Sequence, residues 1–209
     1  MEISITLFCL KLLIYSLRYG IIILLKEVEN VNFIIVDLEA TCLKERDENF
    51  ISEIIEIGAV KLNSCGETLE EFNCFVKPTI NPILSDFCTE LTSITQEDVD
   101  NGLRRKDALS MFQEFCGDNC MILSWGGYDR NQLKKEFERF HLPTQILNNH
   151  INLKVEFSKV IGATKQYGMA RALNITKIPL DGTHHRGIDD AKNISKIFVK
   201  YLDKWSFIG

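Results

Sequence analysis

The feature that most constrains the fold is an uninterrupted apolar run, Phe-Ile-Ile-Val, at residues 33–36. A strand that faces water on one side alternates apolar and polar residues, whereas a strand covered on both faces is apolar throughout. The run therefore predicts a central strand in a sheet that carries other structure on both sides.

The rest of the sequence supplies neighbours for this strand. Two β-rich runs, at residues 54–62 and 69–76, are joined by a polar loop containing Gly66, which predicts an antiparallel hairpin. Further on, hydrophobic spacing predicts helices over residues 108–116, 133–140, 167–173 and 191–201, and a short strand over residues 121–125. A meander followed by alternating helix and strand predicts an α/β fold with a mixed sheet, helices on both faces and ligands at the carboxyl ends of the strands.

The composition is that of one folded domain with an appendage. The chain has 209 residues, 45% hydrophobic and 25% charged, a balance that excludes disordered and low-complexity classes. Its net charge of -5 provides no global positive field for duplex DNA, so any nucleic-acid contact has to be local. The seven cysteines include no C-x-x-C pair, which argues against a zinc ribbon or a disulfide framework. Reduced thiols of this kind favour a cytoplasmic location.

The one candidate boundary lies near residue 30. Residues 3–25 are almost wholly apolar, and a charged stretch over residues 26–30 follows. This length suits a membrane helix, but Lys11 and Arg18 interrupt it, at about 2.5 to 3.5 kcal/mol each near a helix centre. A packed accessory helix or an extension outside the fold is therefore favoured over membrane contact through residues 3–25. We expect an extension of uncertain role over residues 1–30 and one folded domain over residues 31–205.

Two carboxylates, Asp37 and Glu39, follow the apolar run directly. Because successive side chains of a strand point to opposite faces, we expect both carboxylates on one side and Leu38 on the other. Two like charges at the end of a buried strand are costly unless they are neutralised, and Mg²⁺ or Mn²⁺ suits oxygen ligands. The pair indicates a metal site, and the competing interpretation is an ordinary polar strand end.

Another acid stands where a helix is expected to begin. Asp129 lies between the strand expected to end at Trp125 and the helix that follows. With Gln132 three residues later it could form a capping box, which would explain the residue without any function. A cap and a metal ligand do not exclude each other.

Two histidines and two acids lie at the entry of the last expected helix. Asp189 and Asp190 fall in its first turn, where the helix dipole favours negative charge. His184 and His185 lie in a polar loop, and an ordinary histidine pKa of about 6.5 suits a general base at neutral pH. These residues alone do not decide between the two histidines or between the two acids.

Five of these residues have the order and spacing of a known constellation: Asp37, Glu39, Asp129, His185 and Asp190. In this the chain resembles the DEDDh group of 3′-to-5′ exonucleases. The H-x-G-x-x-D spacing of that group selects the second histidine and the second acid of the two pairs. The resemblance implies a ribonuclease H-like three-layer fold with a mixed five-stranded sheet, and it makes residues 31–205 an exonuclease domain.

Within that group the chain looks most like the Eri-type exonucleases, which trim RNA 3′ ends. The similar stretches are residues 37–42, 53–56, 84–88, 91–96 and 187–193. Ser93 departs from the subfamily pattern, which has glycine at this position. The resemblance implies hydrolysis of the terminal phosphodiester bond of single-stranded nucleic acid, with RNA preferred and nucleoside 5′-monophosphates released. We expect no stable binding of duplex DNA.

The resemblance also assigns roles. Two divalent cations, Mg²⁺ or Mn²⁺, would be held by Asp37, Glu39, Asp129 and Asp190. His185 would be the general base and Glu39 would share in catalysis. The substrate would contact Ala40, Thr41, Leu91 and Trp125. Two alternatives stay open: an inactive nucleic-acid-binding or scaffold domain of the same fold, and a metal phosphohydrolase that acts on small nucleotides.

Overall fold

The computed structural model describes residues 31–208. The expected extension over residues 1–30, with its candidate membrane segment, lies outside the described residues. Within the described part of the chain, no helix has both the length and the apolar character that a membrane span requires.

The described residues form one mixed sheet with the strand order β4-β3-β2-β1-β5-β6. Its strands are β1 (Asn32–Ala40), β2 (Ile54–Leu62), β3 (Thr68–Lys77), β4 (Leu103–Arg104), β5 (Cys120–Ser124) and β6 (Ile151–Asn152). β1, β2 and β3 pair antiparallel, whereas β5 lies parallel to β1 and β6 lies parallel to β5. The expected meander followed by parallel strands is confirmed. The sheet has six strands rather than five because it includes two-residue pairings that are too short to leave a hydrophobic pattern.

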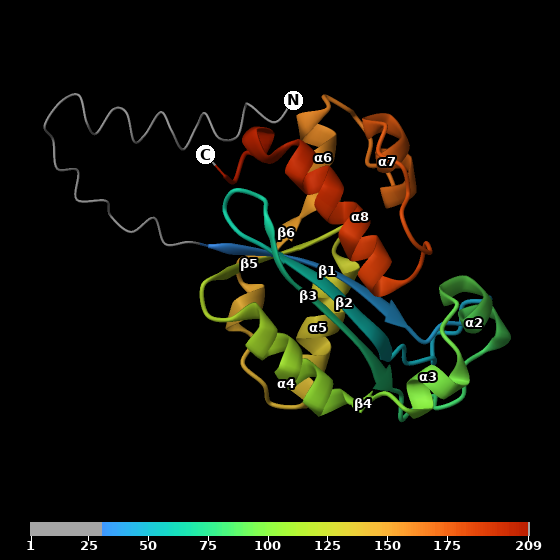
Figure 1. Cartoon of the computed structure of the whole chain (residues 1–209). Coiled ribbons are helices and arrows are strands. Elements are labelled where there is room, and N and C mark those ends of the chain that lie inside the picture. Colours follow the sequence, from blue (N-terminus) through green and yellow to red (C-terminus); the bar gives the residue numbers. More distant parts are fainter. Residues whose placement is uncertain (1–30, 209) are drawn as a thin grey trace, which may run out of the picture.

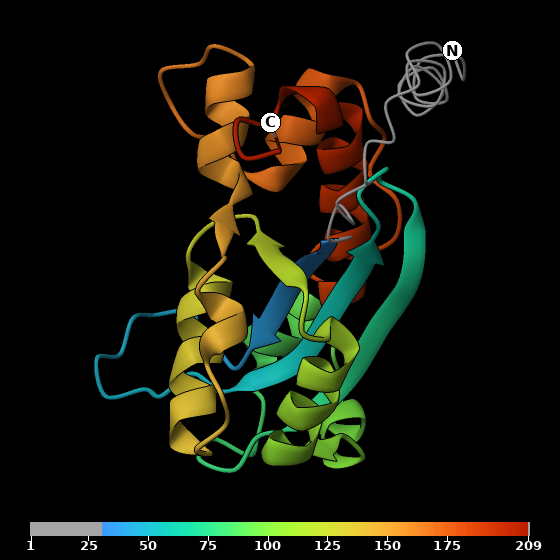
Figure 2. The same cartoon turned by 90° about the vertical axis from the view of Figure 1, so that its left-hand side faces the viewer.

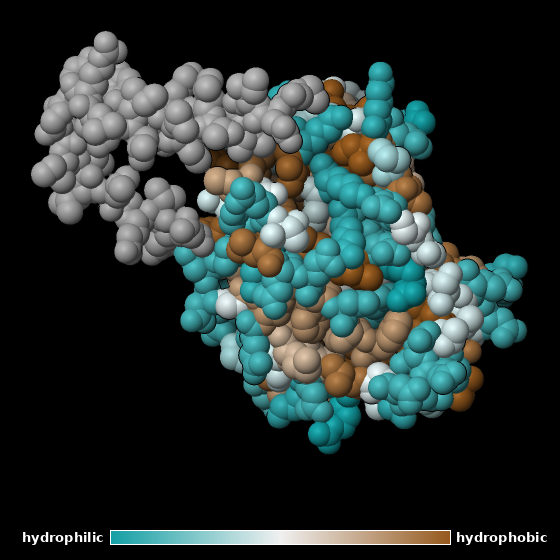
Figure 3. Space-filling view, in the orientation of Figure 1, coloured by the Kyte–Doolittle hydropathy of each residue, from teal (hydrophilic) through white to brown (hydrophobic). Residues whose placement is uncertain are grey.

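Helices cover both faces of this sheet. They are α2 (Asp86–Thr92), α3 (Gln96–Asp100), α4 (Arg105–Cys116), α5 (Tyr128–Arg139), α6 (Leu153–Val160), α7 (Met169–Thr176) and α8 (Gly187–Lys200). Figures 1 and 2 show α6, α7 and α8 on one face of the sheet and α4 and α5 on the other, with α2 and α3 beyond the end of β1. Figure 3 shows hydrophilic side chains over α8 and apolar ones gathered between α4 and α3.

β1 is the centre of the molecule, as its apolar run predicts. Ile34 and Val36 are fully buried against the α4–α5 side, where Phe112 and Phe137 also pack. Phe33 and Ile35 are buried on the other side, in the cluster that includes residues of α6 and α8. Because side chains alternate along a strand, Asp37 and Glu39 lie on the same face as Phe33 and Ile35, which is the face that α8 covers. This places the two carboxylates under the first turn of α8.

The start of α8 approaches the sheet unusually closely because two glycines meet there. Gly58 lies opposite Asp37 in the β1–β2 register, and a β-carbon on Gly58 would lie 2.1 Å from the carbonyl carbon of Gly187. A β-carbon on Gly187 would in turn lie 3.0 Å from the carbonyl oxygen of Asp37. No side chain fits between the two backbones, so the helix begins directly on the strands that carry the acids.

Candidate active site

Carboxylates from two elements meet at the carboxyl end of β1. Asp37 and Glu39 of β1 and Asp190 of α8 each place a carboxylate oxygen within 4.8 Å of the others. Glu39 and Asp190 are buried, and Asp37 is partly exposed. The structure thus brings together the two acids that alternation put on one face and the later acid of the H-x-G-x-x-D spacing. Asp189 instead turns to the preceding loop, where its Oδ2 accepts a hydrogen bond from the Thr183 amide at 2.8 Å.

Asp129 reaches this cluster from α5. β5 pairs with β1 only as far as Ile35, so the amide of Leu38 lies beyond the end of that pairing. Oδ1 of Asp129 accepts a hydrogen bond from this amide at 3.2 Å, which replaces the missing strand partner. The carboxylate is therefore held beside the Leu38 amide, outside the group of three acids whose oxygens all lie within 4.8 Å of one another.

The expected capping box at Asp129 is wrong. α5 begins at Tyr128, its N-cap is Gly127, and no side chain caps it. Asp129 is the second residue of the helix and faces the sheet, and Gln132 donates through Nε2 to the carbonyl of Ser52 at 2.9 Å. The spacing of Asp129 and Gln132 in the sequence fits both a capping box and the observed arrangement. Only the residue at which the helix begins distinguishes them.

Burial raises the proton affinities of these four acids, and repulsion from neighbouring acids adds to this for Asp37 and Glu39. Burial raises the pKa of Asp37 well above its usual range, and the charges of Asp129, Glu39 and Asp190 raise it further. Burial, followed by the charges of Asp190 and Glu56, raises the pKa of Glu39 to about 8. Burial also raises the pKa of Asp129 and of Asp190. Four carboxylates in this state form an all-oxygen donor set that lacks balancing positive charge, which fits Mg²⁺ or Mn²⁺.

Both histidines lie against Asp190. Nδ1 of His184 is 3.0 Å from Oδ2 of Asp190, and the backbone amide of His185 donates to the same oxygen at 3.1 Å. The two rings stack with centroids 4.0 Å apart. Burial and the neighbouring His184 lower the pKa of His185, and Asp190 partly opposes this. Because the structure brings both rings to the acid, the choice of His185 over His184 stays a prediction.

The expected substrate contacts occupy different environments. Ala40 and Thr41 are buried just past the acids, and the Thr41 backbone is tied to Glu53 and Ser52. Leu91 of α2 is 36% exposed. Trp125 donates through Nε1 to the Tyr167 carbonyl at 2.9 Å, and its ring lies 5.4 Å from that of Phe157.

Sequence reasoning missed two residues around the cluster. Tyr128 directly precedes Asp129, and it is 51% exposed with its hydroxyl 3.3 Å from that of Ser52. The available signal was an aromatic residue adjacent to the acid, whereas the prediction selected the larger Trp125. Glu56 of β2 is fully buried and lies opposite Glu39 in the sheet register. Its role could not be read from the sequence because its partner, Arg186, is far away along the chain.

Known proteins are similar to this chain in sequence and in architecture. The family model described as Exonuclease matches residues 34–198. The chain belongs to the exonuclease family. The Xenopus laevis protein "ERI1 exoribonuclease 2" is 34% identical over 202 residues, which cover 81% of this chain and 28% of that protein. The "Probable 3'-5' exonuclease KapD" of Bacillus subtilis (strain 168) is 32% identical over 182 residues, which cover 83% of this chain and 88% of KapD.

The exonuclease family also accounts for the fold. The solved nuclease domain of 3'hExo, a DEDDh family member bound to rAMP, matches with a TM-score of 0.77 at 30% identity. This match covers 83% of this chain and 92% of that chain. The ribonuclease H-like three-layer architecture implied by the sequence is confirmed. The chain spans little more than a quarter of the length of the ERI1 exoribonuclease 2 relative, at 28%.

The raised pKa of Glu39 predicts how stability depends on pH when no metal is bound. An unfolded glutamate loses its proton near its ordinary value of 4.5, whereas folded Glu39 holds it up to about 8. Its contribution to the free energy of unfolding is therefore fully present below pH 4.5 and is lost as pH rises through about 8. We expect the melting temperature in a chelating buffer to fall across this range, and Glu39→Gln to make the dependence shallower.

The matched control is Glu90→Gln on the exposed surface of α2, which should leave the slope unchanged. A metal-free protein that gains stability between pH 5 and pH 8 would contradict the assignment of the raised pKa.

Proposed function

We propose that this chain is a metal-dependent exonuclease that removes nucleotides from the 3′ end of single-stranded RNA and releases nucleoside 5′-monophosphates. The observation that carries the proposal is the cluster of buried carboxylates on β1 and α8, which has too little positive charge of its own. Membership of the exonuclease family supports the reaction type. Relatives named as 3′-5′ exoribonucleases support RNA as the substrate.

The four acids would hold the metal. Two divalent cations, Mg²⁺ or Mn²⁺, bound by Asp37, Glu39, Asp129 and Asp190, would stabilise the attacking and leaving oxygens of the displacement. Their charge would also bring the cluster close to neutrality, so that a phosphodiester group can approach. The protein's contribution is a fixed arrangement, in which β1 holds two acids rigidly and α5 and α8 each present one from their first turns.

His185 would take the proton from the attacking water. The lowered pKa of its ring keeps it neutral at pH 7, which a general base requires. His184 is engaged through Nδ1 with Asp190 and would orient that carboxylate. Glu39 is part of the cluster, so it would help to position the attacking water as well as the metal ions.

The substrate strand would lie across the end of β1. Leu91 offers an exposed apolar side chain and Trp125 a half-buried wall for the terminal nucleotide. Tyr128 adds an exposed ring next to Asp129 on which a base can stack, a contact worth about 1 to 3 kcal/mol. The Thr41 amide donates to the Glu53 carbonyl, and the carbonyls of Ala40 and Thr41 accept from Cys88 and Ser52. A ribose 2′-hydroxyl would donate to the second lone pair of one of these carbonyls.

The two alternatives predict different results. An inactive binding or scaffold domain would bind single strands without shortening them, and a small-nucleotide phosphohydrolase would cleave nucleotides but leave oligonucleotides intact. The complete set of clustered acids favours hydrolysis over the first alternative. Products of an end-labelled oligoribonucleotide distinguish the exonuclease from both alternatives, and hydrolysis of a small nucleotide distinguishes the two alternatives from each other.

The chemistry is tested by removing single acids. Asp37→Asn and Asp190→Asn should each lower nucleotide release from a 5′-labelled oligoribonucleotide by at least about a hundredfold, because each removes a metal ligand at the reacting phosphate. Chelation should abolish activity, and Mg²⁺ or Mn²⁺ should restore it. Asp189→Asn is the control and should keep most activity, since Asp189 faces the Thr183 loop. Loss of activity in Asp189→Asn with retention in Asp190→Asn would show that the wrong acid was chosen.

The general base is tested on the two histidines. His185→Ala should lower kcat by about 10²- to 10⁴-fold at neutral pH, the usual loss for a positioned base. His184→Ala should lose much less, and calorimetric titration should show that His185→Ala still binds Mn²⁺, because the base is not expected to be a ligand. The reverse ranking of the two variants would assign the base to His184.

Substrate choice is tested on RNA and DNA single strands of matched sequence. RNA should be shortened faster because only RNA offers the 2′-hydroxyl. Without a strongly basic surface the enzyme should release its substrate often, which gives ladders of intermediates and activity that weakens as salt rises. Equal rates on the two strands would refute the RNA preference, and disappearance of full-length RNA without intermediates would refute distributive action.

A further inference from the structure

A fifth carboxylate lies beside the proposed metal ligands and is not one of them. Glu56 of β2 is directly opposite Glu39 in the antiparallel register, so the two side chains project on the same face of the sheet. Glu56 is fully buried, at 0% exposed. Like charges in this position destabilise a sheet, and Glu56 contributes to the raised pKa of Glu39.

The negative charge of Glu56 is balanced by hydrogen-bond donors from a single turn of the chain. Nε of Arg186 is 3.2 Å from its Oε2, and Nη2 of Arg186 is 3.2 Å from its Oε1, which makes a two-pronged ion pair. The amide of Gly187 also donates to Oε2 at 2.9 Å. Both donors come from the turn between His185 and the start of α8, and that helix carries Asp190.

Backbone geometry and close packing restrict the position of this turn. His185 has a positive φ of 65°, a backbone conformation that residues other than glycine rarely adopt. Gly187 is pressed against Gly58, where no β-carbon fits. A shift of the turn would therefore displace the two histidines, which lie against Asp190. The Arg186–Glu56 pair is the side-chain connection that joins this turn to β2.

From the contacts of Arg186 and Glu56 we propose that Arg186 is a positioning residue: it anchors the histidine turn to β2 and keeps the Glu56 carboxylate out of the metal site. This inference rests on the proposed function, because it concerns the same carboxylate cluster. Arg186 acts through Glu56 and Asp190 rather than on the substrate. A lysine could supply the charge but not the two parallel hydrogen bonds.

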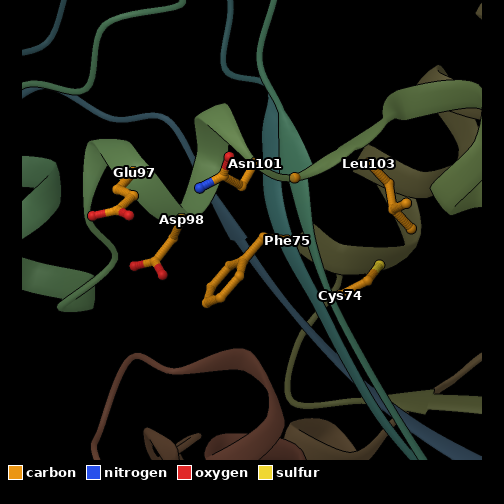
Figure 4. A pocket seen from close by; sticks show the side chains of 7 residues that line it. Cys74, Phe75, Glu97, Asp98, Asn101 and Leu103 are labelled. Atoms are coloured by element: carbon orange, nitrogen blue, oxygen red, sulfur yellow. The ribbon is translucent and has the colours of Figure 1, made fainter.

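The guanidinium group of Arg186 also lies over Phe75, a residue that lines a surface pocket. Its guanidinium carbon lies 5.1 Å from the centre of the Phe75 ring. Phe75 and Asp98 line a pocket of about 290 Å³ between β3 and α3, and Figure 4 shows their side chains together with those of Glu97 and Asn101. Hydrogen bonds from Thr95 lower the pKa of Asp98, and the charge of Arg186 adds to this. The charge of Arg186 thus acts on Asp98 at the surface as well as on Glu56, whereas its two hydrogen bonds both go to Glu56.

The test compares Arg186→Gln, Arg186→Lys and the double variant Glu56→Gln/Arg186→Gln. Arg186→Gln should lower kcat about ten- to a hundredfold with KM for an RNA oligonucleotide within about twofold, since the catalytic turn moves but the strand contacts remain. Calorimetric titration with Mn²⁺ should show roughly three- to tenfold tighter binding in Arg186→Gln, because Glu56 becomes an unpaired carboxylate beside the site. The double variant should return Mn²⁺ affinity to that of the wild type and recover part of kcat.

The matched control is Lys192→Gln, which removes another ion pair between α8 and the sheet. Nζ of Lys192 lies 2.7 Å from Oε2 of Glu71 on β3, and both groups are partly exposed and away from the acids. This variant should match the wild type in kcat and Mn²⁺ affinity. Arg186→Lys should keep wild-type Mn²⁺ affinity with an intermediate kcat, and it replaces Arg186→Gln if that variant does not fold.

Three results would overturn the proposal. The first is Arg186→Gln, or Arg186→Lys in its place, behaving like Lys192→Gln in kcat. The second is a change in Mn²⁺ affinity that Glu56→Gln does not reverse. The third is activity that falls only in proportion to the unfolded fraction measured by circular dichroism. If the wild type releases no nucleotides, the proposed function fails, whereas the Mn²⁺ affinities of the variants still decide the role of Arg186.

Discussion

The removal of carboxylates from water at the end of β1 is the constraint on which the rest of the structure depends. Asp37, Glu39, Asp129 and Asp190 all have raised pKa values, and burial is the first cause for each. Such a cluster destabilises the fold unless protons or metal ions balance it. The surrounding structure must therefore hold the acids together at a cost in stability. It can do so because β1, which carries two of them, is covered on both faces and held rigidly.

The helices are placed to reduce this cost. α5 and α8 both begin at the cluster, so each directs the positive end of its dipole toward the acids and carries one of them in its first turn. Glu53 provides a second anchor at the start of β2. It is fully buried, accepts hydrogen bonds from the amides of residues 79–81, and pairs with Arg105 at 3.0 Å. Glu53 thus ties the loop after β3 to the end of the sheet that carries the site.

Local sequence was enough to predict the elements with strong patterns. The apolar run of β1, the hairpin of β2 and β3 and the pairing of Asp37 with Glu39 on one face follow from periodicity alone. Features that depend on distant partners did not follow. The hydrogen bond of Asp129 to Leu38 joins residues 91 positions apart, and that of Arg186 to Glu56 joins residues 130 apart. For the same reason Trp125, whose indole is tied to Tyr167, could not be distinguished from an exposed base-stacking ring.

The order of the elements along the chain has a consequence for biosynthesis. Asp37 lies in the first strand of the described chain, and Asp190 lies in its last α-helix. During translation the meander of β1, β2 and β3 can pair soon after it leaves the ribosome, because its contacts are close in sequence. The acid cluster forms only when α8 has also emerged and docked at Gly58. A nascent chain still attached to the ribosome therefore has no assembled centre until nearly all of the domain has been made.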